Sequence, residues 1–170
     1  MEKRILGIDV GALAIKATLT HAGEAVSLYR PHKGEPERAI ISVARELCEK
    51  PDAVAMTGAG GRLLAQKLGI FYVDPAVALI GASTDSEVRH IIDIGGGSLS
   101  IVDLDEDGRF AGYRTNSLCA AGTGSFLDEQ AARMKLGEDQ RSAEFDIVEP
   151  PRIAARCAVF AKSDLIHRQQ

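Results

Sequence analysis

Two short glycine turns, each preceded by an aspartate, are the residues of this sequence best suited to chemistry. Asp9 stands two residues before Gly11, and Asp93 stands two residues before Gly95 in a turn that runs on to Ser98. A glycine turn directly after a strand lets backbone N–H groups approach phosphate oxygens with no side chain in the way. An aspartate beside a phosphate chain needs a cation, and hydrated magnesium fits that position. Taken singly, each turn is more typical of a tight hairpin.

The two turns are related copies. Residues 8–11 read Ile-Asp-Val-Gly and residues 92–95 read Ile-Asp-Ile-Gly, at an offset of 84 residues. The strands expected after them, 14–20 and 98–104, keep the same offset. Such a spacing is too long for a solenoid repeat and fits a duplicated small domain. We therefore expect two α/β domains, 1–86 and 87–170, the second incomplete because it lacks strands and helices that the first contains.

Two related turns facing one another would clamp a polyphosphate between the domains. Asp9 and Asp93 would then hold a hydrated magnesium ion beside the phosphates. Lys16 either reaches a phosphate from its strand or is a solvated strand lysine. The predicted nucleotide contacts are Gly11, Ala12, Lys16, Gly95, Gly96, Gly97 and Ser98.

The elements that position these residues follow from periodicity and from turn residues. We expect strands at 4–10, 14–20, 25–29, 53–57, 70–73, 98–104 and 110–115, with another beginning at His90. Helices are expected at 36–49, 62–68 and 75–82. A further helix, capped by Thr123 or Ser125, should stop at Gly137. A last helix should carry Ile153, Cys157, Phe160, Ala161 and Leu165 on one side.

The segment Thr57-Gly-Ala-Gly-Gly-Arg62 is a third glycine-rich turn. It could be another anion-binding loop that opens a helix. A strand-to-helix turn that needs glycine is the favoured interpretation.

Composition excludes several classes of function. The 170 residues carry a net charge of -4, so a general basic field for nucleic acid is absent, and 45% hydrophobic residues predict a folded chain. No apolar stretch approaches the ~20 residues that cross a bilayer, and Asp9 and Lys16 interrupt any signal-peptide core. We expect a cytoplasmic protein that binds neither membrane nor nucleic acid.

The three cysteines, Cys48, Cys119 and Cys157, form no disulfide framework and no CxxC pair. Spacing alone favours ordinary buried cysteines. Cys119 lies just before an expected helix start, where a thiolate is stabilised. Two cysteines cannot fill a four-iron cluster unless another chain supplies two more.

Five segments of this sequence resemble, in order, the motifs of one protein family. They are GIDVG, TGAGGR, DIGGGS, NSLCAAGTGSFLDEQA and RCAVFAKSDLIHRQQ. The first and third occur widely among actin, sugar kinases and heat-shock chaperones and specify only the fold. The last two are more specific, and in them the sequence resembles the ATPase activators of 2-hydroxyacyl-CoA dehydratases and the ATPase subunits of benzoyl-CoA reductase. The resemblance implies duplicated ribonuclease-H-like, actin-like domains, the second truncated.

The same resemblance implies a cofactor set and a mechanism. Cys119 and Cys157 would ligate one [4Fe-4S] cluster at the two-fold axis of a homodimer, two from each subunit, which reverses the interpretation from spacing. ATP and Mg²⁺ would drive an electron from a donor such as ferredoxin or flavodoxin to a dehydratase or reductase. Two alternatives remain: an amino-sugar type kinase of the same fold, and a non-catalytic ATP-binding regulatory protein. In the first turn, Ala12 and Leu13 stand where the family offers a Ser or Thr hydroxyl.

Overall fold

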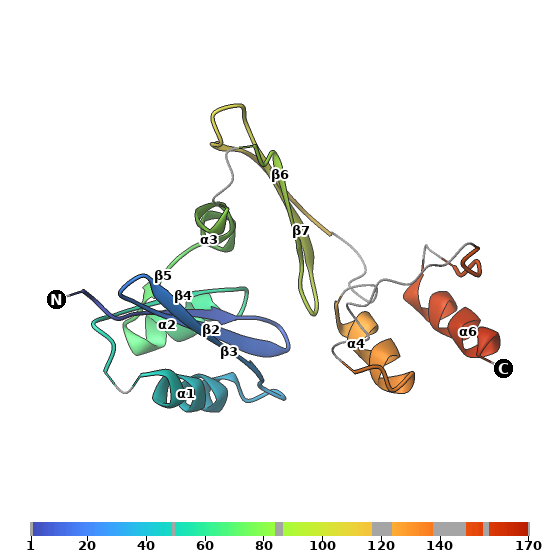
Figure 1. Ribbon diagram of the computed structural model, residues 1–170, viewed down its shortest axis with the longest axis horizontal. Helices are drawn as coiled ribbons and strands as arrows, with labels where there is room; N and C mark the ends of the chain where they lie inside the picture. The colour runs from blue at the N-terminus through green and yellow to red at the C-terminus, as the bar shows by residue number, and fades with distance from the viewer. Residues whose placement is uncertain are drawn as a thin grey trace. The chain divides into compact units, whose positions relative to one another are not determined.

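The structure is a computed structural model that describes residues 2–48, 50–83, 87–116, 124–137, 149–154 and 157–169. The chain divides into two compact units, Met1–Asp93 with Ser100–Arg114, and Ile94–Leu99 with Thr115–Gln170. Figure 1 shows the order of the elements along the chain. Within the described residues, no helix is both long and apolar enough to span a membrane.

The first unit contains a five-stranded sheet in the order β3-β2-β1-β4-β5. Its strands are β1 Ile5–Val10, β2 Ala14–His21, β3 Glu24–Pro31, β4 Ala53–Thr57 and β5 Phe71–Tyr72. The first three strands form an antiparallel meander. Strand β4 pairs in parallel with β1, and β5 pairs in parallel with β4. The meander and the strand at 53–57 confirm the sequence prediction, whereas the strand predicted at 70–73 is only two residues long.

The core of this sheet lies under helix α1, Pro36–Leu47. α1 buries Ala39, Ile40 and Val43, whose spacing predicted the helix. These side chains pack with apolar residues of the strands. The fully buried strand residues are Leu6, Val10, Ile15 and Met56. Helix α2, Gly61–Leu68, contacts β4 and β5. It ends at Gly69, which takes the left-handed backbone conformation that glycine adopts without steric cost.

A second, three-stranded sheet has the order β6-β7-β8, with bounds His90–Ile94, Leu99–Leu104 and Phe110–Thr115. It repeats the meander of the first sheet. The turn bond is the same in both: Gly11 N–H donates to Ala14 O (3.0 Å), and Gly95 N–H donates to Ser98 O (2.8 Å), 84 residues later. The structure thus reproduces the repeat that the sequence predicts. Along the chain, helix α3, Pro75–Ala82, follows β5 and precedes β6, as predicted.

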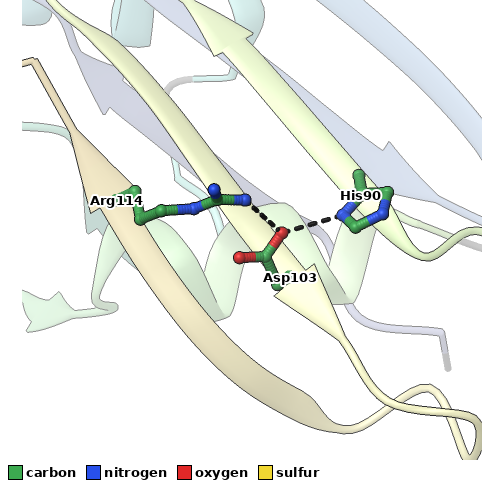
Figure 2. Close-up of polar contacts among 3 residues, drawn as sticks. All are labelled: His90, Asp103 and Arg114. Carbon is green, nitrogen blue, oxygen red and sulfur yellow. Dashed lines mark hydrogen bonds and ion pairs between the residues drawn. The ribbon is translucent and has the colours of Figure 1, made fainter.

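One polar cluster joins the three strands of the second sheet (Figure 2). Asp103 on β7 accepts hydrogen bonds at Oδ1 from His90 Nδ1 on β6 and from Arg114 Nη2 on β8, both at 2.8 Å. The hydrogen bond from His90, with that from Arg114, lowers the pKa of Asp103 below its ordinary value. The sequence assigns no role to these three residues, because no local pattern predicts a contact across three strands.

The C-terminal part of the chain contributes helices α4, Gly124–Arg133, and α6, Ala158–Arg168. They lie side by side, because Lys162 pairs with Glu129 and Arg133 Nη1 donates to Gln169 Oε1 at 2.6 Å. α4 buries Gln130 and Ala131.

The limits of these two helices correct the sequence prediction. α4 ends before Gly137: Lys135 takes the left-handed conformation (φ 56°), and Leu136 N–H closes the end on Ala131 O. Ser125 lies inside α4 and is not its cap, and Thr123 falls outside the described residues. The last helix begins at Ala158, so Ile153 precedes it in an irregular segment that follows two prolines.

Candidate functional site

Asp9 and Lys16 face one another across the first hairpin. Asp9 is the second-to-last residue of β1 and pairs in register with Lys16 on β2 and with Thr57 on β4. Lys16 Nζ lies 3.2 Å from Asp9 Oδ2, with the lysine side chain 57% exposed and the aspartate 33% exposed. The carboxylate therefore stands at the sheet surface, open to a ligand and balanced by one cation.

The first glycine turn is fixed by backbone contacts. A Cβ on Gly11 would lie 3.0 Å from Ala14 O, so any other residue would crowd the turn. His32 N–H donates to Leu13 O (3.0 Å), and His32 Nε2 lies 3.3 Å from Gly11 O. These bonds leave Ala12 and Leu13 exposed at the tip. A ligand here would meet the backbone of the tip and the Lys16 ammonium, because the tip side chains carry no polar group.

The loop from Thr57 to the start of α2 packs directly on β1. Gly58 is buried and left-handed (φ 91°), and a Cβ there would clash with Asp9 Oδ1 and lie 2.5 Å from Val10 O. Gly60 N–H donates to Val10 O at 3.1 Å. The structure confirms the predicted strand-to-helix turn and adds a contact with Asp9 that was not predicted from the sequence. The only sequence signal for it is the glycine itself.

The second glycine turn is held by the first residues of α4. Gly124 N–H donates to Gly95 O (2.9 Å), and Ser125 N–H donates to Gly96 O (3.2 Å). A Cβ on Gly124 would lie 3.0 Å from Gly95 O, so this close approach requires glycine. Two N–H groups at the start of α4 therefore donate hydrogen bonds to the turn and are not available to a ligand.

The predicted site residues fall into separate groups. Asp9, Gly11, Ala12 and Lys16 lie together in the first unit, while Gly95 to Ser98 form a turn in the second. Asp93 is a half-buried residue of β6. Their joint clamp on one ligand stays a prediction.

Cys157 is the cysteine of the predicted cluster pair that the structure describes. It is the N-cap of α6, with extended backbone and a half-buried free thiol. Its carbonyl accepts from Ala161 N–H at 2.9 Å, and its side chain caps no backbone group. The prediction that it lies on the apolar side of a helix is wrong, because the helix starts one residue later. The position at the positive end of a helix suits a thiolate ligand.

The other cysteines are less informative. Cys119 lies outside the described residues. Cys48 follows α1, and its N–H donates to Ala44 O, so a structural role fits it. Among the described residues, no three His, Cys, Asp or Glu side chains gather closely enough to hold a metal ion.

Comparison with known proteins decides between the families that share such turns. The family model of the BadF/BadG/BcrA/BcrD ATPase family matches residues 6–170. The chain belongs to this ATPase family. The resemblance seen in the sequence motifs is thereby confirmed.

Relatives within the ATPase family agree with this. The (R)-2-hydroxyglutaryl-CoA dehydratase activating ATPase of Acidaminococcus fermentans is 32% identical over 172 residues, covering 95% of this chain and 65% of that protein. A benzoyl-CoA reductase subunit from Thauera aromatica is 28% identical over 175 residues, covering 95% of this chain and 62% of that protein. The chain thus spans somewhat less than two thirds of the length of these relatives.

A solved structure confirms the fold. The crystal structure of component A of the Acidaminococcus fermentans (R)-2-hydroxyglutaryl-CoA dehydratase matches with a TM-score of 0.75 and 27% identity. The match covers 98% of this chain and 68% of that one. The α/β, actin-like ATPase fold predicted from the sequence is therefore correct.

Proposed function

We propose that the full-length protein is an ATPase that uses ATP hydrolysis to deliver a low-potential electron to a partner enzyme. One observation carries the proposal. In each meander the first strand ends with an Asp and one further residue, a Gly follows, and the N–H of that Gly closes the turn on the carbonyl three residues later. Two such turns in one chain of an ATPase family fit the two sides of a nucleotide clamp.

At the nucleotide, the described residues have distinct roles. Asp9 and Asp93 act as catalytic carboxylates that hold Mg²⁺ through water, since magnesium binds phosphates together with one or two carboxylates. Lys16 leaves Asp9 for a phosphate oxygen once magnesium balances the carboxylate. The turns at Gly11 and Ala12 and at Gly95 to Ser98 contact the phosphates through backbone N–H groups other than those of Gly11 and Gly95, which already donate to Ala14 O and Ser98 O. Hydrolysis then needs only a water placed in line with the terminal phosphate.

The electron-carrying group of the proposal is a [4Fe-4S] cluster. Cys157 fits as a ligand because it has a free thiol and stands at the N-cap position of α6, whose N-terminal N–H groups favour negative charge. Cys119 would be the second ligand, and a second copy of the chain would supply the other two, which makes the protein a homodimer. Such a cluster, when bound, stores and releases one electron.

The partner is a 2-hydroxyacyl-CoA dehydratase or a related reductase. Two relatives support this part of the proposal, one an activating ATPase of a dehydratase and the other a subunit of a reductase. The electron would come from ferredoxin or flavodoxin, and the protein would act in the cytoplasm.

The test is anaerobic iron and sulfide analysis of the full-length dimer. Wild type should hold four irons per dimer, Cys119→Ser and Cys157→Ser should lose them, and Cys48→Ser should keep them as the matched control. A full cluster in both Cys119→Ser and Cys157→Ser contradicts the assignment. Release of ADP that depends on an added amino sugar would instead identify a kinase.

Asp93→Ala tests the nucleotide part of the proposal. Magnesium-dependent ATP turnover should be abolished while the circular dichroism spectrum and the iron content stay unchanged. Turnover equal to that of wild type would remove the role given to Asp93.

A further inference from the structure

The carboxylate of Asp9 is confined on both of its oxygens. Oδ2 faces Lys16 Nζ at 3.2 Å. Oδ1 faces the backbone of Gly58, at a spot that any side chain on residue 58 would occupy. The exposed lysine can move away, whereas the buried backbone of Gly58 cannot. The orientation of the carboxylate is therefore set from the Gly58 side.

Gly58 is itself held in place by Tyr72 on β5. The Tyr72 hydroxyl donates to Gly58 O at 3.3 Å, and the ring lies under Arg62, whose guanidinium carbon is 5.0 Å from the ring centroid. Arg62 also reaches Asp74, with Nη2 3.8 Å from Oδ2. Parallel pairing of β4 with β5 places Tyr72 beside Met56, two residues before Gly58. The tyrosine thus fixes the loop carbonyl from the neighbouring strand.

We infer that Gly58 and Tyr72 are positioning residues for the Asp9 carboxylate. Gly58 provides the space in which Oδ1 sits, and Tyr72 keeps the loop from closing or opening that space. This inference rests on the proposed function, because it gives Asp9 the task of holding hydrated magnesium beside a nucleotide. The geometry of such water-mediated contacts depends on the carboxylate angle, because magnesium demands near-ideal octahedral coordination.

The test compares two glycines that both have a positive φ. Gly58 (φ 91°) and Gly69 (φ 66°) are both left-handed, but a Cβ on Gly69 has no atom within 4 Å. Gly58→Ala and Gly69→Ala therefore both carry the strain of a positive φ, and Gly58→Ala in addition meets Asp9 Oδ1 and the Val10 carbonyl. Tyr72→Phe removes the hydroxyl alone and keeps the ring under Arg62. If Gly58→Ala fails to fold, Tyr72→Phe carries the test.

The measurement is binding of Mn²⁺ in the presence of ADP to the full-length protein, followed by electron paramagnetic resonance. We expect Gly58→Ala to weaken Mn²⁺ binding at least tenfold and Tyr72→Phe threefold or more. Gly69→Ala should bind within twofold of wild type, although its melting temperature falls. For Tyr72→Phe, the Mg²⁺ concentration that half-saturates ATP turnover should rise, while turnover at saturating Mg²⁺ recovers.

The variant Asp9→Asn distinguishes failure of the positioning inference from failure of the proposed metal role of Asp9. If Asp9→Asn loses Mn²⁺ while Gly58→Ala and Tyr72→Phe bind it as wild type does, the positioning inference is wrong and the proposed site survives. If Asp9→Asn binds Mn²⁺ as wild type does, Asp9 holds no metal, and both the inference and the proposed role of Asp9 are overturned. Equal weakening by Gly69→Ala and Gly58→Ala would also overturn the inference, because strain alone would then explain it.

Discussion

Replacing Lys16 by methionine should separate nucleotide binding from folding. Both side chains of the ion pair are partly exposed, Lys16 at 57% and Asp9 at 33%. Such pairs contribute about 0.2–1 kcal/mol to the free energy of unfolding. Methionine keeps the unbranched chain beside Tyr29, the register partner of Lys16 on β3. The free energy of unfolding should therefore fall by less than about 1 kcal/mol. A hydrogen bond from the ammonium to a phosphate contributes about 1.5–3 kcal/mol, so nucleotide Kd should rise roughly 10- to 150-fold.

The assay is a thermal melt without ligand and a calorimetric titration with ADP and Mg²⁺, both on the full-length protein. Lys67→Met is the matched control, because Lys67 Nζ lies 2.8 Å from Glu37 Oε1 in a more exposed ion pair, at 64% and 55%, that includes no predicted nucleotide contact. It should change the melt as little as Lys16→Met does and leave ADP affinity unaltered. Unaltered ADP affinity in Lys16→Met would refute the phosphate role. A loss of several kcal/mol in its stability would show that the Asp9 pair is structural.

Three further predictions concern the stability of the fold and the protonation of Asp103. Met56 is 1% exposed in the core of the five-stranded sheet, so Met56→Ala should lower the free energy of unfolding by about 2–5 kcal/mol in urea titration. Leu63→Ala, at a site 77% exposed, should change it by less than about 0.5 kcal/mol. The hydrogen bonds from His90 and Arg114 lower the pKa of Asp103 in the folded state, so their stabilisation is complete above the unfolded pKa of about 3.9 and is lost as pH falls through the lower folded value. Carboxyl NMR titration of Arg114→Met should give Asp103 a pKa nearer to 3.9, and an unchanged pKa would contradict the cause given.

The strands and turns of this protein could be predicted because their signals are local. Alternating apolar residues and the glycine turn predicted β1 and β2, and the repeat at offset 84 predicted β6 and β7. Helix ends were less predictable. Gly137 is an obvious stop signal, yet Lys135 takes the left-handed conformation two residues earlier, at a position where lysine has no intrinsic advantage.

The candidate site was predictable as a set of residues and not as a set of contacts. Asp9 and Lys16 pair because they are register partners of one hairpin, which a short turn fixes. The contact between Gly58 and Asp9 depends on the parallel pairing of β1 with β4, which are separated along the chain by β2, β3 and α1. No local pattern specifies that register.

The two glycine turns share a backbone bond but differ in what they offer a phosphate. The tip of the first, Ala12 and Leu13, has no hydroxyl, so binding there must come from backbone N–H groups and from the Lys16 ammonium. The second contains Ser98, whose Oγ would lie 3.2 Å from a Cβ on Gly95 and so sits close over the turn. Its carbonyls are held by α4. A ligand that draws on the second turn must accommodate the start of α4, and that helix follows the segment that contains Cys119. The proposed nucleotide turn thus bonds the helix that follows the segment with the predicted cluster ligand Cys119, and the proposed coupling of ATP hydrolysis to electron transfer would run through α4.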